Sequence, residues 1–118
     1  RGRRRRLMAL LVYEKPSCTA CRKLAKLLEE QGIDFESVEY HVTGLTADEV
    51  RNLLAKADIT AAEALRMREE GARELASEDE ETIVTAMAAR PELLQRPIVV
   101  NGDRAVLARP VERALEVL

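Results

Sequence analysis

A pair of cysteines lies where an apolar strand gives way to a helix, and this junction constrains the fold more than any other sequence feature. Leu7–Tyr13 is a continuous apolar run, which is typical of a strand that is buried on both faces. Ser17 is suited to cap a following helix, and Gly32 is suited to end it in the left-handed conformation. Cys18 therefore falls in the first turn of the predicted helix, and Cys21 lies one turn later.

The residues that follow complete a strand-helix-strand unit and then become helical. Ile33–Tyr40 has strand character, and the two strands of such a unit are expected to be parallel with a right-handed crossover. After Gly44, three Ser/Thr-x-x-Glu capping boxes predict three helix starts. The boxes are Thr46 to Glu49, Thr60 to Glu63 and Ser77 to Glu80, and Pro91 is expected to end the third helix.

The C-terminal part returns to strands. Ile98–Val100 and Ala105–Ala108 predict a hairpin around Asn101-Gly102, a pair suited to a type I′ turn. Pro110, at a first helical position, predicts a last helix that runs to Leu118. The order βαβ, helical insertion, ββα, with Cys-x-x-Cys at the first junction, indicates an α/β protein with a thioredoxin-like fold and a mixed central sheet.

Charge and composition narrow the classes of partner. Five of the 19 basic residues lie in positions 1–6, so the remaining 14 face 21 acidic ones and the body is acidic. Such a body repels phosphate backbones, and a chain with 3% aromatic residues lacks stacking platforms, so we expect no direct nucleic-acid binding. No run approaches the roughly 20 apolar residues of a membrane span. We expect a disordered basic arm over 1–6 and a single, monomeric domain over 7–118.

The two cysteines predict redox chemistry. Unpaired N–H groups at a helix start favour the thiolate of Cys18, and Lys15, Arg22 and Lys23 add positive charge, which makes Cys18 the candidate nucleophile. Cys21, one turn later, is a candidate resolving thiol. Either residue could instead be a small buried side chain without chemistry.

Metal binding and a structural disulfide are the less favoured roles of the pair. A single Cys-x-x-Cys supplies two ligands, and the lone His41 is expected at the far end of the second strand, so we expect no metal. Without the apolar core of a secretion signal, closely spaced cysteines indicate a reducing cytoplasm rather than a disulfide-stapled protein.

A proline leads directly into the predicted third strand. Pro97 is tolerated there because it precedes the ladder, and it becomes a structural residue of the site if a cis Arg96–Pro97 bond turns a backbone edge toward the substrate. The sequence alone leaves the isomer open.

Four separated segments resemble the glutaredoxin-coupled arsenate reductase (ArsC) family, over about Leu10 to Leu118. They are Tyr13-Glu14-Lys15-Pro16-Ser17-Cys18, Ala64-Leu65-Arg66, Gln95-Arg96-Pro97-Ile98-Val99-Val100 and Ala108-Arg109-Pro110. The resemblance implies that Cys18 is the nucleophile and that Arg66, Arg96 and Arg109 bind the oxyanion. Fork-shaped guanidinium groups beside a helix start suit a tetrahedral dianion.

The resemblance also implies the reaction, a thiol-dependent reduction of arsenate to arsenite without a bound cofactor. Cys18 attacks arsenate, a second thiol attacks the Cys18 sulfur, and arsenite departs as a disulfide forms. Glutathione with glutaredoxin, or thioredoxin, then serves as reductant, and Cys21 offers an internal second thiol.

Two departures from the family leave a second interpretation open. Glu14 and Lys15 stand where the family commonly has His and Asn, and a carboxylate there opposes the Cys18 thiolate unless Lys15 or Arg22 offsets it. Cys21 replaces a usual Ser, so the segment is also similar to the Spx regulators, which use a Cys-x-x-Cys redox switch and bind RNA polymerase. Those regulators generally lack the Ala-Arg-Pro segment, so Arg109 favours the enzyme.

Overall fold

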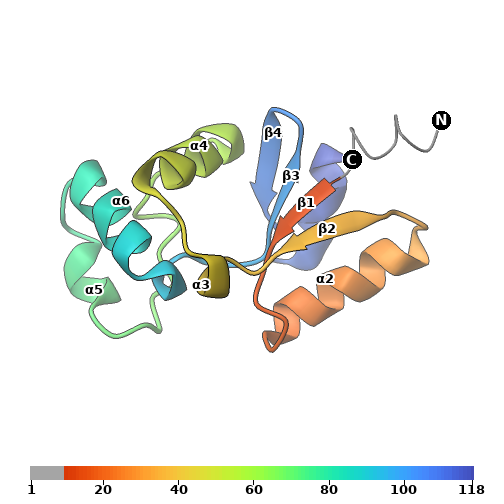
Figure 1. Ribbon diagram of the computed structural model, residues 1–118, viewed down its shortest axis with the longest axis horizontal. Coiled ribbons are helices and arrows are strands. Elements are labelled where there is room, and N and C mark those ends of the chain that lie inside the picture. Colours follow the sequence, from red (N-terminus) through yellow and green to blue (C-terminus); the bar gives the residue numbers. More distant parts are fainter. Residues whose placement is uncertain (1–9) are drawn as a thin grey trace. The chain divides into compact units, whose positions relative to one another are not determined.

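The computed structural model describes residues 10–118, which divide into two compact units (Figure 1). The first unit contains residues 10–39 and 96–118, and the second contains residues 40–95. The predicted basic arm over 1–6 lies outside the described residues, as does the start of the predicted first strand.

A four-stranded sheet forms the centre of the first unit, in the order β2-β1-β3-β4. β1 is parallel to β2 and antiparallel to β3, and β3 is antiparallel to β4, so the predicted mixed sheet is confirmed. The strands are β1 (Leu10–Tyr13), β2 (Phe35–Val38), β3 (Ile98–Asn101) and β4 (Arg104–Leu107).

Helix α2 (Thr19–Glu30) connects β1 to β2. The expectation that Ser17 caps it is wrong, because Cys18 occupies the cap position with extended backbone angles, φ −78° and ψ 130°. Gly32 follows the end of the helix with φ +69°, as predicted, and donates its N–H to the carbonyl of Glu29 (3.0 Å). The one-residue shift places the first cysteine at the boundary of the helix instead of inside it.

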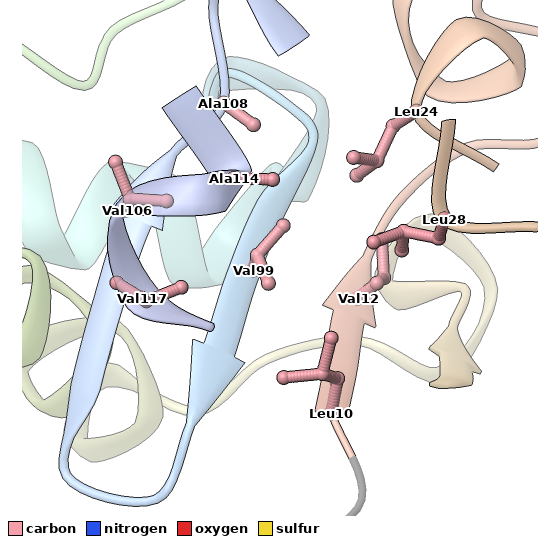
Figure 2. Close-up of a cluster of buried hydrophobic side chains, with 9 residues drawn as sticks. All are labelled: Leu10, Val12, Leu24, Leu28, Val99, Val106, Ala108, Ala114 and Val117. Atoms are coloured by element: carbon pink, nitrogen blue, oxygen red, sulfur yellow. The ribbon is translucent and has the colours of Figure 1, made fainter. Parts of the chain in front are cut away.

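The core of this unit joins the sheet to α2 and to the C-terminal segment η2 (Val111–Val117), as Figure 2 shows. Its buried members are Leu10, Val12, Leu24, Leu28, Val99, Val106, Ala108, Ala114 and Val117. η2 is a 3₁₀-helix that begins at Val111, with Pro110 as its cap. The sequence predicted a helix with Pro110 as its first residue, so both the type of helix and its first residue are corrected. So short a segment forms few of the cooperative bonds that favour an α-helix.

The hairpin turn lies one residue later than expected. Asn101 pairs with Arg104 in the ladder, so the central residues are Gly102 and Asp103, and Gly102, with φ +66°, fits a type II′ turn better than the expected type I′. The Asn101 side-chain amide donates to the carbonyl of Val117 (2.6 Å). That long-range bond engages the residue that the sequence assigned to the turn.

The second unit is helical. Its elements are α3 (Tyr40–Thr43), α4 (Ala47–Ala57), α5 (Ala72–Leu75), α6 (Glu80–Ala89) and the 3₁₀-helix η1 (Pro91–Leu93). Tyr40, expected as the last residue of a strand, instead begins α3, because its ring is fully buried and its hydroxyl donates to the carbonyl of Leu94 (2.7 Å). Pro91 follows the end of α6 as predicted.

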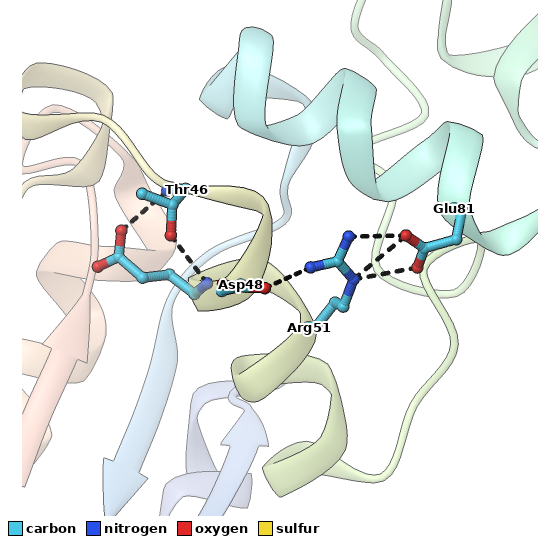
Figure 3. Close-up of polar contacts among 5 residues, drawn as sticks. Thr46, Asp48, Arg51 and Glu81 are labelled. Carbon is cyan, nitrogen blue, oxygen red and sulfur yellow. Dashed lines mark hydrogen bonds and ion pairs between the residues drawn. The ribbon is translucent and has the colours of Figure 1, made fainter.

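The capping box at the start of α4 is complete, as Figure 3 shows. The Thr46 hydroxyl accepts the N–H of Glu49 (3.0 Å), and the Glu49 carboxylate accepts the N–H of Thr46 (2.8 Å). Nearby, Arg51 bridges Asp48 of its own helix and Glu81 of α6 on the surface. Exposed ion pairs of this kind contribute little to stability.

The second predicted box closes both of its hydrogen bonds, between Thr60 and Glu63, yet no helix follows it. The backbone turns away because Leu65 forms a bridge with Leu94, and the N–H of Arg66 donates to the carbonyl of Leu93 (2.7 Å). The prediction of a second helix is therefore wrong, because the backbone groups that would form it make hydrogen bonds with residues far along the chain.

The third predicted box, Ser77 to Glu80, does not form. α6 begins at Glu80, and the carboxylate of Asp79 caps it by accepting the N–H of Thr82 (3.3 Å). The Glu80 carboxylate accepts the N–H of Ala61 (3.1 Å) instead of reaching back to Ser77. Over residues 10–118, no helix has the length and apolar character that crossing a bilayer requires.

Candidate active site

The register of the sheet gathers three chain segments at one end of the first unit. Tyr13, the last residue of β1, pairs with Ile98, and Ile98 pairs with Leu107 near the end of β4. The loop after β1, the residues before β3 and the residues after β4 are therefore neighbours. A hydrogen bond from the N–H of Ala108 to the carbonyl of Pro97 (2.9 Å) joins the last two segments.

Cys18 lies in the first of these segments, between a turn and a helix. Its N–H donates to the carbonyl of Lys15 (2.9 Å), which closes the turn, and its carbonyl accepts the N–H of Arg22 (3.0 Å), the first bond of α2. The residue is half-buried, so it is held at the start of the helix without being enclosed in the core.

The surroundings of Cys18 favour its thiolate. Partial burial opposes ionisation, but the backbone N–H and thiol of Cys21, the N–H of Ala20 and the charge of Arg96 outweigh it. Together they lower the pKa of Cys18 from 9.0 to about 7. The positive charge that acts on Cys18 is thus that of Arg96, whereas the sequence predicted Lys15, Arg22 and Lys23. Arg22 and Lys23 are exposed to solvent, which screens their charges.

Cys21 has the opposite environment. Its side chain is only 1% exposed, and burial, the thiol and charge of Cys18 and the charge of Glu14 raise its pKa to about 12, against the lowering effect of the Lys15 N–H. Cys21 thus faces inward, as its alternative interpretation as a buried helix residue required. The two thiols nevertheless interact by a hydrogen bond, and both cysteines are free.

Two of the three predicted arginines belong to the same end of the sheet. Arg96 precedes β3 and is 5% exposed, and Arg109 follows β4 and is exposed. The Nη1 atom of Arg109 donates to the carbonyl of Arg96 (2.7 Å), which couples the two segments. Pro97 is buried, and its bond to Arg96 is cis; the bond between Arg109 and Pro110, for which the sequence raised no such question, is cis as well.

Arg66, the third predicted oxyanion ligand, belongs to the second unit. It is half-buried, and its Nε lies 3.4 Å from the carboxylate of Glu69. The backbone bond to Leu93 fixes its position within that unit. That Arg66 acts together with Cys18 stays a prediction.

Glu14 is the site residue whose role the sequence did not reveal. It is 7% exposed, and its charge acts on Cys21, whereas the sequence suggested an effect on Cys18. The available signal was the alternation of β1, because Leu10 and Val12 are buried and Glu14 continues their spacing. Across residues 10–118, no three His, Cys, Asp or Glu side chains are grouped as a metal site.

Comparison with known proteins decides the family, because residues 13–117 match the model of the ArsC family. The chain belongs to the ArsC family. An arsenate reductase from Neisseria meningitidis is 31% identical over 112 residues, covering 91% of this chain and 96% of the relative. The Escherichia coli protein YfgD is 36% identical over 112 residues, covering 91% of this chain and 94% of YfgD.

Solved structures agree with this assignment. The structure of an arsenate reductase from Vibrio cholerae has a TM-score of 0.87 at 32% identity, and the match covers 94% of this chain and 98% of that one. The thioredoxin-like α/β fold expected from the sequence is thereby confirmed. The chain is an oxidoreductase related to the arsenate reductases.

Proposed function

We propose that this ArsC-family protein reduces arsenate to arsenite with Cys18 as the nucleophile. The observation that carries the proposal is the half-buried cysteine at the start of α2, with a pKa of about 7, at the same sheet end as Arg96 and Arg109. The arsenate reductases among its relatives support this substrate.

In the first step, the Cys18 thiolate attacks arsenic. A sulfur–arsenic bond forms, and an arsenic–oxygen bond breaks as its oxygen takes up protons and leaves as water. Arg109, exposed beside the site, offers to the oxyanion the guanidinium N–H groups other than the Nη1 that bonds to Arg96, while the charge of Arg96 adds to the groups that favour the Cys18 thiolate. The start of α2 adds the positive end of a helix dipole.

In the second step, a thiol attacks the Cys18 sulfur. We assign this role to Cys21, because its thiol already makes a hydrogen bond with Cys18. The Cys18–Cys21 disulfide forms, the sulfur–arsenic bond breaks, and its electron pair stays on arsenic, which falls from the pentavalent to the trivalent state and leaves as arsenite. Thioredoxin, or glutathione with glutaredoxin, would then reduce the disulfide.

The decisive experiment is an arsenate-dependent NADPH-oxidation assay on purified protein, run separately with a thioredoxin system and with glutathione plus glutaredoxin. Cys18→Ser should abolish turnover. Arg109→Ala should raise KM for arsenate about ten- to hundredfold, because one charge-assisted contact contributes about 1.5–3 kcal/mol. Arg113→Ala, which removes an exposed arginine of η2, is the matched control and should leave KM unchanged.

A protein that shows no arsenate-dependent turnover with either system, but still forms the Cys18–Cys21 disulfide in peroxide, would contradict the proposal and favour the Spx-like redox sensor. Its partner would then be RNA polymerase rather than an oxyanion. The monomeric state and the cytoplasmic location are predictions that gel filtration and cell fractionation test.

A further inference from the structure

The inner row of β1 ends in a charge. Leu10 and Val12 alternate along the strand and are buried in the core cluster, and Glu14 continues the same row at 7% exposure. Among residues 10–118, Glu14 and Arg96 are the two charged residues with buried side chains. A buried carboxylate is costly unless it has a partner or a task, so its position calls for an explanation.

The inner row of α2 ends in a thiol. Cys21, Leu24 and Leu28 lie three and four residues apart and are the buried residues of the helix. Figure 2 shows the part of this interface farther from the cysteines, where Leu28 meets Val12 of the strand. Because β1 and β2 are parallel, α2 must run back along the sheet, so its first turn lies beside the end of β1.

These two rows bring Glu14 and Cys21 together at one end of the same interface, where β1 ends and α2 begins. The backbone N–H of Lys15, the residue after Glu14, interacts with the Cys21 sulfur, which sets that sulfur against the backbone at the end of β1. The charge of Glu14 acts on Cys21 and stabilises its protonated form. The strand thus presents a carboxylate to the thiol that the proposed mechanism needs as its second nucleophile.

We propose that Glu14 accepts the proton of the Cys21 thiol when Cys21 attacks the sulfur of a modified Cys18. This inference rests on the proposed role of Cys21 as the resolving thiol. The Cys21 sulfur forms a bond to the Cys18 sulfur, the bond from Cys18 to its adduct breaks, and the electron pair leaves with the adduct. The Cys21 proton passes to the Glu14 carboxylate and from there to water.

The step needs such an acceptor because a thiol with a pKa of about 12 is almost entirely protonated at neutral pH. The other groups that act on the pair are the two thiols themselves, the charge of Arg96 and the backbone N–H groups of Ala20 and Cys21 on Cys18, and the backbone N–H of Lys15 on Cys21. An arginine and a backbone N–H do not accept protons. Glu14 is therefore the buried base available to Cys21.

The test uses the reduced, intact chain and one equivalent of the disulfide reagent dithiobis(nitrobenzoate), so no oxyanion is involved. Cys18 attacks the reagent first and releases one thionitrobenzoate; Cys21 then attacks the mixed disulfide and releases a second, in a separate phase. Glu14→Gln should slow the second phase by about a hundredfold, the lower range for general base catalysis, and leave the first within about twofold. Glu14→Asp should restore part of the rate. Glu36→Gln, an exposed carboxylate of β2, is the control.

The wild-type protein provides a second test that no folding defect can disturb. With Glu14 as acceptor, the rate of the second phase should be nearly constant between about pH 6 and about pH 8, whereas a Cys21 that ionises by itself would accelerate about tenfold per pH unit. A tenfold rise per unit, or a Glu14→Gln protein as fast as wild type, overturns the proposal. Loss of the second phase in wild-type protein would instead reject the resolving role of Cys21.

Discussion

The reactivity of Cys18 toward an alkylating agent should follow a titration with a midpoint near pH 7, because its pKa is lowered to about 7 from 9.0. Since the folded pKa is depressed, the thiolate accumulates as pH rises through about 7 and is lost below it. Cys21, with its pKa raised to about 12, should contribute no labelling in this range. The rate should therefore rise with pH and level off above neutrality.

The size of the effect follows from the two pKa values. At pH 7, about half of Cys18 is thiolate, against about one part in a hundred for a thiol with a pKa of 9.0, a gain of about fiftyfold. A less basic thiolate is also a weaker nucleophile, by about tenfold for two units at a Brønsted slope of about 0.4–0.5. Cys18 should therefore react about fivefold faster than an ordinary thiol at pH 7, and more slowly than one at high pH.

The assay is labelling with limiting iodoacetamide across pH, followed by peptide mapping that separates the two cysteines by mass-spectrometric fragmentation. Arg96→Gln should move the midpoint upward, because it removes the positive charge that favours the thiolate. Arg22→Gln, an exposed arginine on α2, should leave the midpoint where it is. A wild-type midpoint near 9, or preferential labelling of Cys21, would refute the assignment of the nucleophile and of its charge partner.

Two further predictions concern stability and are measured by urea unfolding at neutral pH. Leu28→Ala, which truncates a fully buried side chain of the core cluster, should lower the free energy of unfolding by about 2–5 kcal/mol; a loss below about 1 kcal/mol would mean that the α2 interface is not packed as described. Thr46→Ala, which removes the capping hydroxyl of α4, should cost about 1 kcal/mol, whereas Thr46→Asp, which keeps an acceptor, should cost less.

Much of the fold was predictable because its signals are local. The apolar run before the cysteines, the glycine after α2 and the capping box at Thr46 each act on backbone within a few residues. The structure confirms those elements. The position of Cys18 at the start of a helix was predictable for the same reason. The low pKa of its thiol depends in part on backbone N–H groups only two and three residues away.

The remaining features were decided by partners far along the chain. The Thr60 box closes its hydrogen bonds and still starts no helix, because the following backbone bonds to residues 93–95. The charge that lowers the pKa of Cys18 comes from Arg96, although Arg22 and Lys23 are nearer in sequence.

The role proposed for Glu14 is of the same kind. From the sequence, the carboxylate is four residues from Cys18 and was expected to oppose that thiolate. In the fold, Glu14 continues the inner row of β1 and Cys21 lies on the inner face of α2, and the charge of Glu14 acts on Cys21. Periodicity along one element tells which face a side chain occupies, but only the packing of two elements decides which side chain it meets. Electrostatic effects depend on the distance between the two charged or polar groups, so they too are set by the packing.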